Sequence, residues 1–329
     1  MSALAPLLQA FFTERLIAQR FASEHTIASY SDTFRLLLGY AGAKTGKKPS
    51  ASDIADLDAA LIARFLDHLE HERHNSVRTR NNRLAAIHSL FSYAALHHPE
   101  HAADIQRVLA IPVKRYDRRM LTWLTDREVD ALLATPDRST WTGQRDHALL
   151  VLAVQTGLRI SELTALTHAD VHLGAGAHVH CMGKGRKERA TPLTVLTVAV
   201  LRSWLATHPG GPRDPLFATR TGTQLSRDAL EHHLAGYLAT ARSNCPSLRG
   251  KRVSIHTLRH TCAMRLLERG TDLAVIALWL GHEKLTSVQT YLHADMAQKE
   301  RAIARVIPPG TRPGRYRPTD PLLAFLEQL

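Results

Sequence analysis

Apolar residues recur at helical spacing through most of this chain, and that periodicity restricts it to a mainly α-helical fold. Four such segments occur in the first 108 residues, and a loop rich in Gly, Lys and Ser is expected at 41–52. The four helical segments cover residues 4–22, 26–40, 57–71 and 76–95. The sequence therefore predicts a small all-helical domain over residues 1–108.

A second domain is expected from residue 125, where T-D-R-E forms a capping box ahead of a helix. A more apolar helix over 141–157 is expected to be central, with Gly157 as its C-cap. Alternating segments at 178–182 and 189–193 flank a basic turn and predict a β-hairpin. We therefore expect a mixed α/β domain with a small hairpin over residues 125–305.

Two connecting segments complete the expected organisation. Residues 109–124 contain a proline and the charge run K-R-Y-D-R-R, which indicates an exposed basic linker. Residues 306–329 begin with a Pro-, Gly- and Arg-rich stretch and end in an apolar helix at Pro321–Leu329. This terminal helix is expected either to pack on its own domain or to dock in trans on a neighbouring subunit.

The charge is unevenly distributed along the chain. The net charge is +12, from 42 Lys and Arg against 30 Asp and Glu. Residues 1–110 hold 12 and 11 of these, so the remaining residues hold 30 and 19. A basic C-terminal two-thirds suits a polyphosphate partner such as DNA. The three scattered cysteines fit a reducing cytoplasm, and no apolar run reaches the ~20 residues of a membrane helix.

Side chains that can act on an anion are concentrated in the stretch Ser254–His293. The candidate side chains within this stretch are His256, Arg259, His282 and Tyr291. Two further candidates, Arg159 and Lys184, lie upstream in the sequence. This combination suits cleavage of a phosphodiester without a metal ion or other cofactor.

Each of these groups has a plausible chemical role. Arg159 and Arg259 can fork onto the non-bridging oxygens of one phosphate. A phenol has a pKa of about 10, and neighbouring guanidinium groups make its proton easier to remove. Tyr291 is therefore the candidate nucleophile, and Lys184 can protonate the leaving 5′-oxygen. The two histidines can assist proton transfer and hydrogen-bond the phosphate.

The segment at 76–95 begins with basic and amide side chains. Arg78, Arg80, Asn81 and Arg83 stand in its first turns. A helix N-terminus of this composition suits contacts with DNA phosphates and base edges. A solvated basic face is the alternative interpretation.

Five motifs occur in the order and at the spacing of the tyrosine recombinases of phage-integrase and Xer type, and the chain resembles that family. They are T-G-L-R-I-S-E-L (156–163), G-K-G-R-K-E-R (183–189), H-T-L-R-H (256–260), L-G-H (280–282) and Tyr291. The resemblance implies a core-binding domain of SAM-like type followed by a catalytic domain. It makes Arg159 and Arg259 the phosphate clamp, with Glu162 supporting the first of them.

The resemblance also implies the remaining roles. Tyr291 would form a 3′-phosphotyrosyl intermediate, Lys184 would be the general acid, His256 an acid/base and His282 a phosphate contact. Arg186 and Lys187 are expected to contact DNA. The protein would be a homotetramer on double-stranded DNA, monomeric or dimeric before synapsis, and would exchange strands through a Holliday junction in the cytoplasm, at the nucleoid.

Other functions remain open at this stage. The same chemistry could serve a type IB topoisomerase or a resolvase, and the same fold could serve a non-catalytic DNA-binding regulator. Whether a recombinase of this kind acts as an integrase, in transposition or on chromosome dimers also stays open. His256 and His260 are four residues apart, as in zinc-binding helices, but Thr257 replaces the glutamate of H-E-x-x-H, which excludes a metalloprotease.

Overall fold

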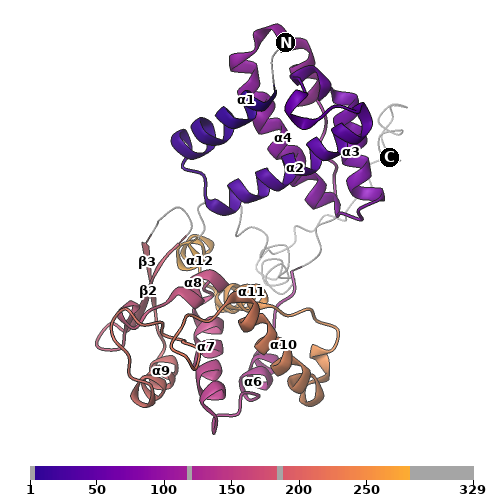
Figure 1. Ribbon diagram of the computed structural model, residues 1–329. Helices are drawn as coiled ribbons and strands as arrows, with labels where there is room; N and C mark the ends of the chain where they lie inside the picture. The colour runs from indigo at the N-terminus through magenta and orange to yellow at the C-terminus, as the bar shows by residue number, and fades with distance from the viewer. Residues whose placement is uncertain (1–3, 117–120, 184–187, 282–329) are drawn as a thin grey trace, which may run out of the picture. The chain divides into compact units, whose positions relative to one another are not determined.

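The chain forms two compact units, Met1–Arg118 and Arg119–Leu329. The computed structural model describes residues 4–116, 121–183 and 188–281. Figure 1 shows a first unit made of helices and a second unit in which helices accompany a small sheet. The predicted mainly helical fold is therefore confirmed. Among the described helices none is long and apolar enough to cross a membrane.

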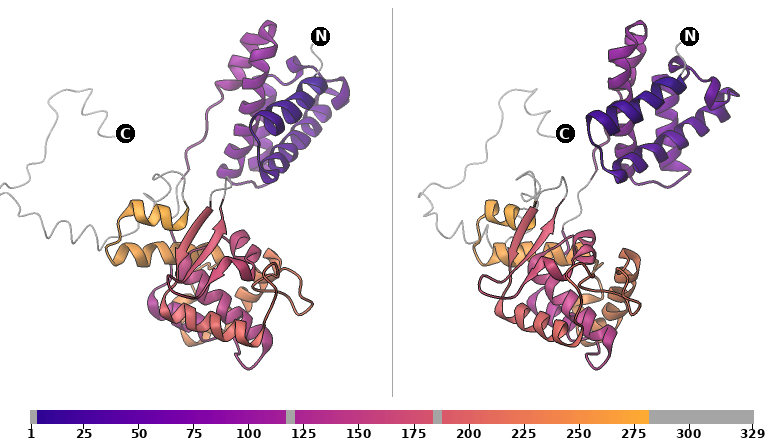
Figure 2. Two further views of the ribbon diagram at one scale, coloured as in Figure 1. Left: turned by 90° about the vertical axis from the view of Figure 1, so that its left-hand side faces the viewer. Right: turned by 60° about the vertical axis from the view of Figure 1, so that its left-hand side comes forward.

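The first unit is built from amphipathic helices whose apolar faces meet in one core. Phe11 is fully buried, and its ring contacts those of Tyr30, Phe34 and Tyr93. The helices are α1 (Leu4–Ala10), the π-helix η1 (Phe11–Gln19), α2 (Glu24–Thr45), α3 (Ala59–His71), α4 (Val77–His97) and α5 (Ala102–Leu109). Figure 2 shows this helical cluster from two further sides.

Two local expectations for the first unit were wrong. The loop expected from residue 41 begins later, because α2 continues to Thr45 and ends at Gly46, which has a φ of +71°. Ala41 packs into the core at 2% exposure, and this packing favours helix beyond the point where the local composition predicts a loop. Helix α5 was not expected at all, although Ile105 and Val108 are fully buried.

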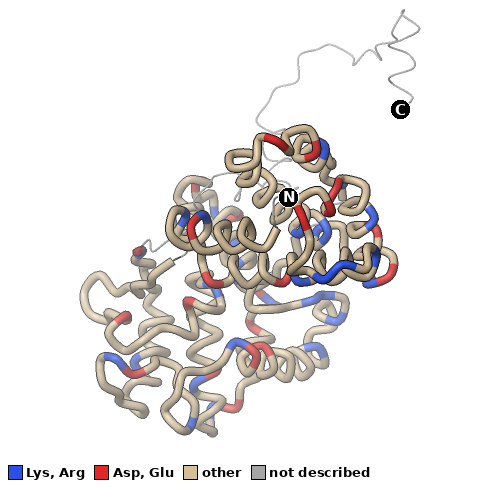
Figure 3. The backbone as a smooth tube through the Cα atoms, turned by 45° about the horizontal axis from the view of Figure 1, so that its top comes forward, with Lys and Arg blue, Asp and Glu red and all other residues tan. Residues whose placement is uncertain are grey.

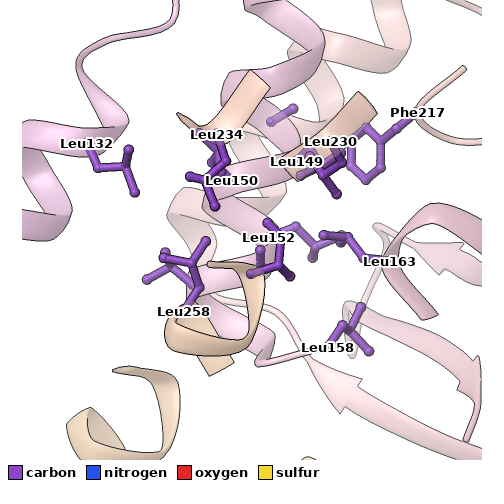
Figure 4. Packing of buried hydrophobic residues seen from close by; sticks show 14 of the residues in the cluster. Leu132, Leu149, Leu150, Leu152, Leu158, Leu163, Phe217, Leu230, Leu234 and Leu258 are labelled. Atoms are coloured by element: carbon purple, nitrogen blue, oxygen red, sulfur yellow. The ribbon is translucent and has the colours of Figure 1, made fainter. Parts of the chain in front are cut away.

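The second unit is organised around helix α7 (Trp141–Thr156). Every residue from Ala148 to Val154 is buried, as expected for a central helix. Figure 4 shows Leu149, Leu150 and Leu152 surrounded by leucines of other segments. The other α-helices described in this unit are α6 (Asp126–Leu133), α8 (Ile160–Ala165), α9 (Val195–Thr207), α10 (Arg227–Asn244), α11 (Ile255–Glu268) and α12 (Leu273–Leu280), of which α12 packs on α11.

The sheet has three antiparallel strands in the order β1-β2-β3. The strands are β1 (Val171–His172), β2 (His178–Met182) and β3 (Glu188–Pro192). The predicted hairpin is confirmed by the pairing of β2 with β3, in which Cys181 lies opposite Arg189 and Met182 opposite Glu188. Strand β1 was not predicted, because a segment of two residues shows no alternating pattern in the sequence.

Local signals also fix the ends of the helices that carry the candidate site. Thr125 and Glu128 form the predicted capping box of α6. Gly157 ends α7 in the left-handed region, with a φ of +64°. Ser254 caps α11 by accepting a hydrogen bond from the backbone N–H of Thr257. Because caps depend on neighbouring residues alone, the sequence predicts them well.

Candidate active site

Arg259 is the most deeply buried charged side chain of the candidate site. It lies on α11 with 1% exposure, although arginine is almost never fully buried without partners. Its Nη1 donates to the carbonyl oxygen of Gly157 at 2.7 Å, and its Nη2 donates to that of Leu280 at 2.5 Å. These carbonyls end α7 and α12, where the helix dipole places partial negative charge. The guanidinium is therefore held between two helix C-termini.

Arg159 occupies the N-cap position of α8 and is more accessible. Its Nη1 donates to Glu162 Oε1 at 2.7 Å, and its Nη2 donates to the carbonyl oxygen of Gly281 at 3.2 Å. The carboxylate of Glu162 also accepts the backbone N–H of Arg159 at 2.8 Å, as the acidic member of a capping box does. About a quarter of the Arg159 side chain, 28%, remains exposed. Glu162 thus contacts both the backbone and the guanidinium of Arg159, and its supporting role in catalysis stays a prediction.

The two arginines converge on one short segment of chain. Arg259 bonds the carbonyl of Leu280 and Arg159 bonds that of Gly281, which are consecutive residues. Gly281 has a φ of +64°, and a Cβ added to it would lie 2.5 Å from Nη1 of Arg189. A side chain at this position would therefore displace the guanidinium of Arg189.

Arg189 of β3 is a member of this cluster that sequence reasoning did not assign to the site. Its Nη2 lies 2.7 Å from Glu162 Oε2, and its Nη1 lies 3.1 Å from Oε1. Glu162 thus accepts hydrogen bonds from two arginines while itself 8% exposed. The sequence signal for Arg189 was its position as the last residue of the motif G-K-G-R-K-E-R. The motif alone does not reveal that Arg189 pairs with Glu162.

The electrostatics of Glu162 follow from these contacts. Burial by itself raises the pKa of this carboxyl, but the hydrogen bonds from Arg189 and Arg159 outweigh it and lower the pKa from 4.5 to about 2. The carboxylate therefore stays ionised and offsets one of the three positive charges of Arg159, Arg189 and Arg259.

Acid should destabilise the protein through Glu162. Because its folded pKa is depressed, its contribution to stability is present above about pH 4.5 and is lost as the pH falls toward 2. The full contribution is on the order of 3 kcal/mol. We expect the free energy of unfolding, measured in urea from pH 6 to pH 3, to fall more steeply for the native protein than for Glu162→Gln. Parallel pH profiles would contradict this assignment.

The histidine of the site that the structure describes is His256. It is exposed on the first turn of α11, and its ring centroid lies 4.5 Å from that of His260. The other expected site residues lie outside the described residues. They are Lys184, Arg186, Lys187, His282 and Tyr291. His282 directly follows Gly281 in the chain, and Lys184 directly follows Gly183.

The four residues expected to contact DNA from α4 do not share one environment. Arg78 is exposed, whereas Arg80 is 5% exposed and donates to the carbonyl oxygen of Pro112 at 3.1 Å. Asn81 donates to the carbonyl of Lys114 at 2.8 Å and accepts its N–H at 3.1 Å. Arg83 pairs with Asp32 at 2.9 Å.

These contacts change the interpretation of the basic helix start. The burial of Arg80 does not support the expectation that it contacts DNA. The side-chain amide of Asn81 is hydrogen-bonded to the backbone of Lys114, which follows α5 in the chain. Both side chains hold residues 112–114 against α4. Figure 3 shows acidic residues interspersed with basic ones around the first unit, in keeping with its small net charge. Arg78 is therefore the member of this set whose side chain is exposed to solvent, and its contact with DNA stays a prediction.

Arg78 and Arg80 form a matched pair for a test. Arg80→Ala should lower the free energy of unfolding by about 1–3 kcal/mol, because it leaves the Pro112 carbonyl without this donor. Arg78→Ala should leave stability unchanged but reduce the slope of log K against log salt by about 0.9, as expected for one lost phosphate contact. Urea denaturation and a DNA-binding salt series measure the two effects. A reduced salt slope for Arg80→Ala at native stability would restore the original interpretation.

The fold and the site together define a class of protein. A helical first unit precedes a second unit in which two guanidinium groups converge beside an ionised glutamate. Guanidinium groups arranged in this way suit the binding of an anion such as a phosphate. The comparisons with known proteins identify the family.

Two family models match this chain. Residues 122–298 match the phage integrase family, and residues 10–98 match the N-terminal SAM-like domain of phage integrases. The chain belongs to the phage integrase family. The predicted SAM-like first domain and the predicted relationship to Xer recombinases are both confirmed.

Relatives match over nearly the whole chain. A protein of Sinorhizobium fredii named as an integrase/recombinase, y4rC, is 54% identical over 328 residues, covering 100% of this chain and 99% of the relative. Tyrosine recombinase XerC of Pelobacter propionicus is 32% identical over 303 residues, covering 89% and 93%.

Solved structures share the fold at lower sequence identity. XerH recombinase bound to a palindromic difH substrate, in a post-cleavage complex, has a TM-score of 0.69 at 24% identity, covering 87% of this chain and 81% of that one. A lambda integrase dimer bound to a COC′ core site has a TM-score of 0.62 at 17% identity, covering 87% and 97%.

Proposed function

We propose that this protein is a site-specific DNA recombinase that cuts and rejoins strands through a 3′-phosphotyrosyl intermediate. The observation that carries the proposal is the convergence of Arg159 and Arg259 on the consecutive carbonyls of Leu280 and Gly281. Two guanidinium groups held this way can neutralise one phosphate by forked hydrogen bonds. The XerH structure is bound to a palindromic difH substrate and the lambda integrase structure to a COC′ core site, and these ligands support a double-stranded DNA site as the ligand of this chain.

The proposed cleavage step transfers a phosphoryl group of the DNA from the 5′-oxygen to the protein. The phenol oxygen of Tyr291 attacks the phosphorus, the bond to the 5′-oxygen breaks and a 3′-phosphotyrosyl bond forms. The phenol proton leaves to a base, for which His256 is the candidate, and Lys184 gives a proton to the departing 5′-oxygen. Arg159 and Arg259 stabilise the negative charge of the transition state, and His282 adds a phosphate contact.

Rejoining reverses the cleavage reaction, with the 5′ end of a different DNA strand as the attacking group. A 5′-hydroxyl of the partner strand attacks the phosphotyrosyl phosphorus and releases Tyr291. The phosphodiester energy is conserved in the covalent bond, so the cycle requires neither a nucleotide nor another cofactor. Exchange of strands in pairs then proceeds through a Holliday junction held by four protomers.

Trapping with a suicide substrate tests the function directly. Nicked duplexes from the DNA flanking the encoding locus are incubated with the protein, and the covalent complex is isolated, digested and sequenced at the junction. We expect a 3′-linked adduct on Tyr291 and joined products from two sites. Relaxation of supercoils without joining would favour a topoisomerase, and specific binding without an adduct would favour a regulator.

We propose that the terminal segment Pro321–Leu329 docks on a neighbouring protomer during assembly. The segment has four leucines and a phenylalanine among its nine residues, and it lies outside the described residues. The second unit has a groove lined by Leu133, Leu196, Leu266 and Trp279, and Leu196 is 69% exposed. An apolar helix laid in such a groove would bury both surfaces.

Deleting residues 321–329 should abolish synapsis and recombination while sparing the binding of one protomer to a half-site. The physical reason is that half-site binding uses the protein–DNA contacts alone, whereas synapsis adds contacts between protomers. Analytical ultracentrifugation on DNA measures the assembly, and native gel shifts measure half-site affinity. Tetramers formed normally by the truncated protein would refute docking in trans.

A further inference from the structure

Arg189 makes a two-point contact that the proposed chemistry does not use. It lies on β3, its side chain is 10% exposed, and both of its terminal nitrogens donate to the carboxylate of Glu162. Forked pairs of this kind fix orientation as well as distance, which a lysine in the same place could not do. Strand β3 is thereby fastened to the start of α8.

Each carboxylate oxygen of Glu162 accepts one hydrogen bond from Arg159 and one from Arg189. Oε1 accepts from Nη1 of Arg159 at 2.7 Å and from Nη1 of Arg189 at 3.1 Å. Oε2 accepts from the backbone N–H of Arg159 at 2.8 Å and from Nη2 of Arg189 at 2.7 Å. Each oxygen therefore links Arg159 to Arg189, and a displacement of one arginine changes the setting of the other.

Gly281 provides a second link between the same two arginines. Its carbonyl accepts from Nη2 of Arg159 at 3.2 Å, and its Cα side faces the guanidinium of Arg189 so closely that a Cβ would lie 2.5 Å from Nη1. Arg159 and Arg189 thus meet both at Glu162 and at the residue that precedes His282. This double contact fixes β3 relative to the phosphate clamp.

The hairpin carries this constraint toward Lys184. Strand β2 pairs with β3 at five consecutive positions, from His178 with Pro192 to Met182 with Glu188, so the two strands move together. Arg189 lies one residue from the tip end of this ladder and five residues after Lys184 in the chain. Arg189 is therefore the anchoring side chain nearest to that end of the paired strands among the contacts described above.

We infer that Arg189 is a positioning residue that sets the general-acid hairpin against the phosphate clamp through Glu162. The inference rests on the proposed function, because it takes Lys184 as the proton donor and Arg159 as the phosphate ligand. Arg189 itself need not touch DNA: its terminal nitrogens are bonded to Glu162, and what it controls is how closely Lys184 reaches the leaving oxygen. Proton donation is sensitive to such placement, because a shift of 1 Å takes a donor out of hydrogen-bond reach.

A 5′-bridging phosphorothiolate separates this role from a purely structural one. The probe is the duplex mapped by suicide-substrate trapping, with sulfur replacing the 5′-bridging oxygen at the scissile position. A thiolate leaves without protonation, since the pKa of a thiol is only about 8.5, whereas the normal 5′-oxygen needs a proton. The substitution therefore restores cleavage when the general acid is lost or misplaced, and does not restore it when the phosphate clamp is damaged.

Single-turnover cleavage rates are measured on both substrates for four variants. Lys184→Ala should be slower by about 10²–10⁴-fold on the oxygen substrate and close to native on the sulfur substrate. Arg189→Ala should be slower by roughly 10–100-fold on oxygen, with most of the loss recovered on sulfur. Arg189→Lys, which keeps a positive charge beside Glu162, should lie between the native protein and Arg189→Ala. Arg202→Ala is the matched control: its Nη2 bonds the carbonyl of Leu173, away from Glu162, and its rates should equal those of the native protein.

The outcomes distinguish a failure of the general-acid role of Lys184 from a failure of the positioning role of Arg189. If Lys184→Ala is not rescued by sulfur, the general-acid role in the proposed function is wrong and this inference falls with it. If Lys184→Ala is rescued but Arg189→Ala loses the same factor on both substrates, Arg189 acts on the clamp or the fold and the inference is overturned. Native rates for Arg189→Ala on oxygen would overturn it too. Arg189→Lys supplies the same comparison should the alanine variant fail to fold.

Discussion

Tyr291→Phe should bind its DNA site with unchanged affinity and form no covalent adduct. Removing the phenol oxygen deletes the nucleophile while leaving the ring, so binding contacts are kept and the attacking atom is lost. Removal of a nucleophile costs more than about 10³-fold in rate, and here no second group replaces it. Denaturing gel electrophoresis of labelled suicide substrate measures the adduct, and a gel shift of the same duplex measures affinity.

Tyr237 is the control for this substitution. It lies on α10, its hydroxyl donates to Asp146 at 2.7 Å, and burial together with this carboxylate raises the pKa of its phenol well above the ordinary value. Tyr237→Phe should therefore keep adduct formation, although it loses one hydrogen bond. Adducts formed by Tyr291→Phe, or lost only in Tyr237→Phe, would show that the nucleophile was assigned to the wrong residue.

Arg259→Ala should have the second large effect, on both the chemistry and the fold. The side chain donates to two buried carbonyls, those of Gly157 and Leu280, and each carbonyl left without its donor costs about 1–3 kcal/mol. The cleavage rate should fall by at least about 10²–10³-fold, as when one preorganised donor to a transition-state oxyanion is removed. Thermal unfolding and single-turnover cleavage measure the two effects separately.

Arg259→Lys separates the effect on stability from the effect on catalysis. A lysine keeps the charge and can bond one of the two carbonyls, so it should recover part of the stability. It cannot fork onto a phosphate, so cleavage should remain depressed by about 10²-fold. Cleavage by Arg259→Ala within tenfold of native, at native stability, would remove Arg259 from the clamp.

Much of the fold was predictable because its signals are local. The helical period marked the helices of both units, the Thr125–Glu128 capping box marked the start of α6, and Gly157 marked the end of α7. Helix α5 was missed because no side-chain cap marks its start at His101, and strand β1 was missed because a two-residue strand has no period to detect.

The candidate site was predictable in its residues and not in its connections. The motifs named Arg159, Glu162 and Arg259, and the structure brings these three together around α8, α11 and the end of α12. The motifs did not indicate that Arg189 shares the carboxylate of Glu162, because those residues are 27 positions apart. Composition at the start of α4 likewise suggested one basic surface, whereas the partner of Asn81 is 33 positions away.

The sequence by itself determined the helical class of this protein, its helix caps and the side chains available for phosphate chemistry, because each depends on residues a few positions apart. The tertiary structure alone decided which of those side chains face the site. It turned Arg80 inward toward Pro112, and it placed Arg159 and Arg259 on consecutive carbonyls. The physical reason is that a buried guanidinium takes its orientation from the acceptors that satisfy it, and those acceptors come from distant parts of the chain.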